Sequence, residues 1–268
     1  MKKNTMTKEE KEKLKGHRKR LRKRFLTQNS NDIDDSRMLE LLLTYSIPQI
    51  DVYPIANALL AKFGDLDNIL SASIDDLCSI KGIGENTAIL IKLQPALGRK
   101  CILAKSKRKT YKNPEDIAKL FCGMFYGICG EKLAVASFTS SFELLSCEWL
   151  SGGYPGECTV DNREIMKILV RNNVGYVAFA HNHPNGDVKP SASDIEAMFR
   201  LKEMINSVSV NLIDMFIISE DRYFKMSEAA TLSDKLGEYS DEEFSYVFGN
   251  SLSSISAEFA EIVIENEL

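Results

Sequence analysis

The chain has 268 residues, of which 44% are apolar, 27% charged and 9% aromatic. At roughly 100 to 200 residues per domain, this length predicts two folded units, and the composition excludes a wholly disordered chain. The longest apolar runs, such as residues 174–180, are far shorter than the about 18 residues that cross a bilayer, and the N-terminus has no apolar signal region. We therefore expect a soluble protein of the cytoplasm without a membrane partner, its cysteines reduced.

The net charge of −4 conceals an asymmetry along the chain. Residues 1–26 contain twelve Lys/Arg and three Asp/Glu, whereas residues 229–268 contain nine acids and a single base. This pattern predicts a basic N-terminal arm over 1–26 and an acidic C-terminal tail over 229–268. We expect the tail to be disordered, or helical against a partner.

Residues 8–26 are rich in straight-chain helix formers and predict a helix with a basic face, interrupted or kinked near Gly16. Such a face is either simply solvated or contacts phosphates, in which case Arg18 and Arg22 are candidate DNA contacts. His17, among these cations, is expected to be a surface side chain.

Residues 27–104 contain apolar side chains at helical spacing, punctuated by Gly and Pro, and predict a small all-α domain of short helices. Within it, the segment LCSIKGIGENTAILI at 77–91 resembles a helix-hairpin-helix. Gly82 and Gly84 would let backbone N–H groups approach a phosphate at the start of the next helix.

Lys81 and Lys92 could add positive charge to this hairpin. Hairpins of this kind also serve purely for packing, so both interpretations stay open. With the basic arm, the hairpin makes DNA a candidate partner of residues 1–112.

A basic stretch at 105–112 predicts a linker, and residues 113–228 predict a second domain. Asn113 followed by Pro114 marks the start of a helix. Strand-like apolar runs follow, and two helical segments lie among them; the runs are 132–138, 142–150, 174–180 and 210–218, and the helices are 162–173 and 193–208. Alternating helices and strands indicate an α/β fold.

The most informative segment is HNHPNGDVKPSASD at 181–194. Residues i and i+2 of a strand point to the same side, so His181 and His183 can converge, and a loop that folds back could bring Asp194 to them. Two histidines and one carboxylate form a three-ligand site that leaves a position for water, as in catalytic zinc centres. A His-x-His pair alone would more often be structural.

This string resembles the metal signature of the JAB/MPN (JAMM) metallopeptidase-like superfamily, which has His-x-His, ten residues, then Asp, with Ser three residues before the Asp. The form HNHPxGD with PS resembles the RadC family in particular, as do GHRKRLRKRFL, LELLLTYSIP and SIKGIGENTA in their order. The resemblance covers the chain to about residue 226. It implies a JAB/MPN-like α+β domain, with a mixed sheet flanked by helices, after the helical domain.

The resemblance also implies roles for particular residues. His181, His183 and Asp194 would bind one Zn²⁺, and Ser191 would stabilise the tetrahedral intermediate. Glu131, before the first strand, would be the general base; Glu164 is the alternative, although we expect it to be helical and structural. The family commonly has His after Asp214, where this chain has Met215.

The leading hypothesis from the sequence is a zinc metallopeptidase that cleaves a peptide or isopeptide bond of an unidentified peptide or protein substrate. The alternative is a DNA-binding, repair-associated module whose metal domain is structural or recruits partners. A nuclease is a third hypothesis, but a single-metal site with a general-base Glu fits amide hydrolysis better.

Overall fold

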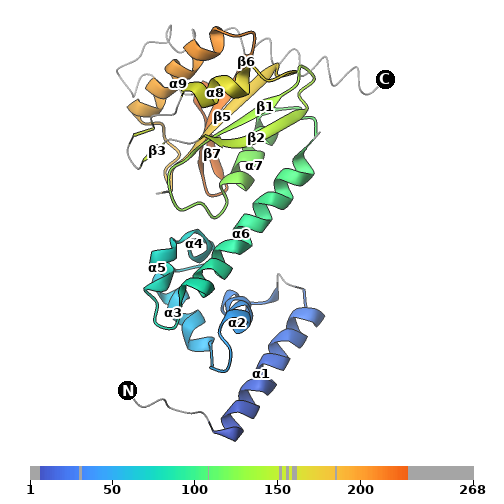
Figure 1. The fold of residues 1–268 in the computed structure, drawn as a ribbon, viewed down its shortest axis with the longest axis vertical. Helices are drawn as coiled ribbons and strands as arrows, with labels where there is room; N and C mark the ends of the chain where they lie inside the picture. Colours follow the sequence, from blue (N-terminus) through green and yellow to red (C-terminus); the bar gives the residue numbers. More distant parts are fainter. Residues whose placement is uncertain are drawn as a thin grey trace. The chain divides into compact units, whose positions relative to one another are not determined.

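The computed structural model describes residues 7–29, 32–107, 109–150, 153–154, 157–158, 162–184 and 186–228 (Figure 1). The chain divides into two compact units, Met1–Gly98 and Arg99–Leu268. The predicted tail 229–268 lies outside the described residues. Among the helices of the described residues, none is both long enough and apolar enough to cross a membrane.

Helix α1 (Lys8–Thr27) runs through Gly16 without a break, so an interruption of the helix there, one of the two predicted alternatives, is wrong. Glycine costs a helix only about 1 kcal/mol relative to alanine, which neighbouring contacts can offset. Here Leu21 is 7% exposed and His17 Nε2 lies 2.5 Å from Oε1 of the buried Glu40. These two contacts hold the helix close to its middle. His17 is therefore a half-buried side chain that pairs with Glu40.

The first unit continues with α2 (Asp35–Ser46), α3 (Tyr53–Phe63), α4 (Leu66–Ser71), α5 (Ile74–Cys78) and the beginning of α6 (Glu85–Ser106). Side chains of Asp34, Asp65 and Ser73 cap α2, α4 and α5 by accepting hydrogen bonds from backbone N–H groups. The apolar residues that recur at helical spacing form one buried core; its members include Leu39, Leu43, Ile55, Leu59, Ile69, Leu77 and Ile91. The expected all-helical region is confirmed.

The second unit is built on a five-stranded sheet of order β2-β1-β5-β6-β7. Its strands are β1 (Leu133–Phe138), β2 (Leu144–Leu150), β5 (Tyr176–Asn182), β6 (Asn211–Ser219) and β7 (Arg222–Lys225). β5 and β6 are parallel and the other neighbours antiparallel, so the sheet is mixed. A small ribbon pairs β3 (Gly153–Tyr154) with β4 (Glu157–Cys158).

Helices cover both faces of this sheet (Figure 1). On one face α7 (Pro114–Phe125) packs Ile117 and Phe121 against alternate residues of β1, β5 and β6. On the other, α8 (Asn162–Leu169) and α9 (Ala192–Asn206) pack against the remaining residues of these strands. Strands covered on both faces are apolar throughout, which explains the uninterrupted runs in the sequence. The predicted α+β fold with a flanked mixed sheet is confirmed.

The structure differs from the linker predicted at 105–112. Helix α6 extends to Ser106, and Thr110 pairs with Glu143 beside β2. The Tyr111 side chain is only 2% exposed, and its ring meets Phe138 edge-on at 5.5 Å. Tyr111, in a segment otherwise rich in lysine, therefore packs into the core of the second unit.

Candidate functional site

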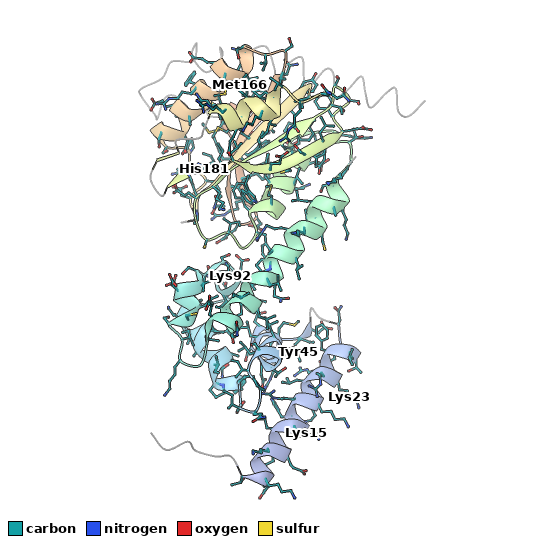
Figure 2. The ribbon with its side chains drawn as sticks, viewed as in Figure 1. Lys15, Lys23, Tyr45, Lys92, Met166 and His181 are labelled. Atoms are coloured by element: carbon teal, nitrogen blue, oxygen red, sulfur yellow. The ribbon has the colours of Figure 1, made fainter. Side chains whose placement is uncertain are left out.

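His181, labelled in Figure 2, is the sixth residue of β5, and His183 follows the strand directly. The His183 N–H donates to the carbonyl of Ile218 at 2.8 Å, so strand-like pairing with β6 continues to this residue. The two imidazoles lie with ring centroids 4.9 Å apart and planes perpendicular. The two-residue period of the strand thus brings both rings to one end of the sheet.

Asp194 reaches the rings from the first turn of α9. Ser191 is the N-cap of this helix, and the two residues form a capping box in which Asp194 Oδ2 accepts from the Ser191 N–H at 2.8 Å and from its hydroxyl at 2.6 Å. Asp194 Oδ1 lies 3.1 Å from His181 Nδ1, and Oδ2 lies 3.4 Å from His183 Nε2. One ligand atom from each of the three residues lies within 4.8 Å of the others, a spacing that suits one metal ion.

The protonation of these groups favours a cation between them. Burial by itself raises the pKa of the Asp194 carboxyl, but hydrogen bonds from His181 and Ser191 outweigh it and lower the pKa to about 2. His183 Nδ1 lies 2.9 Å from the carbonyl oxygen of Asp187, which can only accept, so Nδ1 carries the proton. In neutral His183, the lone pair of Nε2 then faces a carboxylate oxygen.

His181 adds a second indication. Its Nε2 atom is buried and has no hydrogen-bond partner among the described residues. A buried nitrogen without a partner costs free energy unless an ion or a water satisfies it. The donor set of two imidazoles and one ionised carboxylate therefore fits a divalent metal ion such as zinc.

Glu131 lies close to this cluster. Its Oε2 atom is 4.0 Å from His181 Nε2, and its side chain is 46% exposed. A carboxylate at that position is accessible to a water molecule and to a ligand from solvent. Glu164 lies in the first turn of α8, so its predicted helical position is confirmed.

Asn182, between the two histidines, is a residue that the sequence alone did not single out. Its side chain accepts from the Lys132 N–H at 2.7 Å and donates to the Gly130 carbonyl at 3.1 Å, so its amide brackets the backbone on both sides of Glu131. The available signal was its polarity: the middle residue of His-x-His points away from both imidazoles, and a buried polar side chain needs partners.

The position after Asp214 lies in the core. Met215 is 2% exposed and packs with the apolar residues under α8 and α9. Asp214 is fully buried and accepts from the Ser227 hydroxyl at 2.6 Å, the Ser227 N–H at 3.1 Å and the Met215 N–H at 2.8 Å. Asp214 thus fixes the chain that follows β7.

The residues proposed for the hairpin separate into two groups. Gly82 has φ +101°, a conformation that favours glycine, and a Cβ there would lie 2.8 Å from Ile55 Cδ1, so the local backbone and packing already explain this glycine. Lys92, labelled in Figure 2, donates from its Nζ to the Leu70 carbonyl at 2.7 Å. A Cβ added at Gly84, in contrast, would meet nothing within 4 Å, and Lys81 is exposed, so these two residues are accessible.

The two arginines of α1 that were candidate DNA contacts, Arg18 and Arg22, also differ. The Arg18 guanidinium donates to the carbonyls of Thr44, Ile47 and Ile50 at 3.3, 2.9 and 2.7 Å. It therefore anchors the chain after α2, and both of its terminal nitrogens are used within the protein. The Arg22 side chain is exposed and forms no hydrogen bond or ion pair with the described residues.

Each of the two units matches a family of known proteins. A family profile described as RadC-like JAB domain matches residues 111–232, and one described as UPF0758 N-terminal matches residues 15–89. The chain is 35% identical to a UPF0758 protein of Fusobacterium nucleatum over 221 residues, covering 80% of this chain and 95% of the relative. It is 31% identical to one of Ruegeria pomeroyi, covering 77% and 93%, and 30% identical to one of Clostridium botulinum, covering 79% and 93%. The chain therefore belongs to the UPF0758 family of RadC-like JAB-domain proteins.

Proposed function

We propose that the protein is a zinc-dependent hydrolase of amide bonds, with His181, His183 and Asp194 as the metal ligands. The observation that carries the proposal is the cluster itself: an ionised carboxylate faces two imidazole nitrogens, and His181 Nε2 is buried without a hydrogen-bond partner among the described residues. Bound zinc supplies a Lewis acid that polarises a carbonyl and lowers the pKa of water.

The other side chains handle the proton and the developing charge. Glu131, 4.0 Å from His181 Nε2 and open to solvent, accepts a proton from the attacking water and passes it to the leaving amine. Asn182 supports this role because its two hydrogen bonds hold the backbone around Glu131. Ser191 is proposed to donate to the oxyanion; in its resting position its hydroxyl bonds Asp194, so it would have to turn.

The proposal is tested by metal analysis of purified variants. Wild type is expected to hold about one zinc, and His183→Ala to hold none, because two remaining ligands coordinate too weakly. His17→Gln, which alters the third histidine in the other unit, is the control and should keep the zinc. Stoichiometric zinc in His183→Ala would remove His183 from the site.

Glu131→Gln tests the catalytic step. This variant should keep its zinc and lose hydrolysis of a mixed peptide and isopeptide library followed by mass spectrometry, because an amide cannot accept the proton of water. Unchanged cleavage would transfer the role of general base to another group.

The second proposal is association of residues 1–112 with nucleic acid. Two accessible residues favour it: Gly84, which directly precedes α6, and the exposed Lys81, which lies just before it in the chain. Backbone N–H groups at the start of a helix can bind phosphate. Binding of DNA by the full chain, weakened by Gly84→Val, is the expected result.

A further inference from the structure

Helix α1 and the chain after α2 line a cavity of about 380 Å³ in the first unit, and this cavity is open to solvent. Four cationic side chains and two others line it: Lys11, Lys15, Arg18 and Arg22, with Leu14 and Gln49. We call this the basic cavity. No carboxylate is among its lining residues.

The cations of the basic cavity lack counter-charges. The side chains of Lys11, Lys15 and Arg22 form no hydrogen bond or ion pair with any residue that the structure describes, whereas Lys13 on the same helix pairs with Glu9 at 2.7 Å. Like charges gathered on one face repel one another, which favours a bound anion. The Nε atom of Arg18 is buried without a partner among the described residues, and is a further unused donor.

The wall opposite α1 is held in place. Arg18 fixes it through the carbonyls of Ile47 and Ile50, and Gln49 between them has φ +66°, a conformation that costs a non-glycine residue free energy. This geometry places the Gln49 side chain, which can donate hydrogen bonds, in the cavity lining.

The spacing of the cations matches an extended polyanion. Positions 11, 15, 18 and 22 follow i, i+4, i+7, i+11 and share one helix face, about 16 Å long at 1.5 Å per residue. A nucleic-acid strand presents a phosphate every about 3.4 Å along a duplex axis, so several phosphates fit along this face. We propose that the basic cavity binds the phosphate backbone of a nucleic acid.

An anionic membrane is less favoured as the ligand. A helix that lies on a membrane inserts a continuous apolar face. In α1, Leu21 is buried in the unit, and the exposed apolar residues Phe25 and Leu26 lie only in its last turns.

The test compares two triple variants of the full chain with the same change in charge. One is Lys11→Glu with Lys15→Glu and Arg22→Glu, inside the cavity. The control is Lys8→Glu with Lys19→Glu and Lys23→Glu, three exposed positions of the same helix that lie outside the cavity lining. Binding is measured by fluorescence anisotropy of labelled DNA of about 20 nucleotides, single-stranded and duplex, over about 50 to 200 mM salt.

The cavity variant should bind at least about tenfold more weakly than the control, and its slope of log affinity against log salt should be smaller by about 2, because three phosphate contacts are lost at roughly 0.7 each on a single strand. A matched pair of triple alanine variants repeats the comparison without introducing acids, and thermal unfolding shows whether each variant is folded.

Equal weakening by the two sets would overturn the basic cavity while leaving the hairpin, and thus the second proposed function, in place. Absence of wild-type binding at the lowest salt would overturn both. Tighter binding to phosphatidylserine vesicles than to DNA would overturn the nucleic-acid ligand and assign the cavity to membranes. None of these results bears on the metal site, which belongs to the other unit.

Discussion

Asn182→Ala tests how the segment that carries Glu131 is held. The substitution removes the two hydrogen bonds that join Asn182 to the Lys132 N–H and the Gly130 carbonyl, at 2.7 and 3.1 Å. Each bond contributes about 1 kcal/mol net of exchange with water. We therefore expect the local opening free energy to fall by about 2 kcal/mol.

Amide hydrogen exchange measures this change directly. Because every 1.4 kcal/mol is a factor of ten, the Lys132 amide should exchange about 30-fold faster in Asn182→Ala. Zinc content should remain that of wild type, since Asn182 points away from the imidazoles.

The control removes another hydrogen bond of the same sheet. Ser137 is buried in β1, and its hydroxyl lies 2.8 Å from that of Ser146. Ser137→Ala should lower global stability without accelerating exchange at Lys132. If Asn182→Ala leaves exchange at Lys132 unchanged, or if both variants accelerate it alike, the two Asn182 hydrogen bonds do not hold the segment that carries Glu131.

Three further predictions concern stability and binding. Arg18→Ala should destabilise the helical unit by about 2 kcal/mol in urea titrations, because charged donors to three carbonyls are lost, whereas Arg22→Ala should change stability by less than about 0.5 kcal/mol. Burial raises the pKa of Asp214 to about 7 against the hydrogen bonds that lower it, so the native state binds its proton more tightly than the unfolded chain. The contribution of this group to the free energy of unfolding is present below about pH 4 and is lost as the pH rises to 7. Between pH 5 and pH 8, the free energy of unfolding of Asp214→Asn in urea titrations should therefore rise by about 3 kcal/mol relative to that of wild type. A difference between the two proteins that is the same at both pH values would contradict the raised pKa. Gly82→Val should lower thermal stability because valine would have to adopt a φ near +101° and its Cβ would press on Ile55, whereas Gly84→Val should lower it less because its Cβ meets nothing within 4 Å; equal losses would refute the distinction.

The sequence determined the features whose causes are local. Two histidines at i and i+2 of a strand share one side of it, and Ser-x-x-Asp before a helical pattern is typical of a helix start, which here is a capping box. These two regularities place His181, His183 and Asp194 on elements that the tertiary fold then brings together. The helical repeats of the first unit and the doubly buried strands of the second are likewise set by periodicity.

Only the tertiary structure decided which polar residues are used for packing and which are free. Arg18 and Arg22 look alike in the basic arm, yet one bonds three carbonyls of a segment about 30 residues away and the other is unpaired among the described residues. Tyr111 in a lysine-rich stretch enters a core, and Asn182 bonds a backbone 50 residues distant. A side chain's partner depends on which segments the folded chain brings beside it, and such long-range contacts leave no period in the sequence.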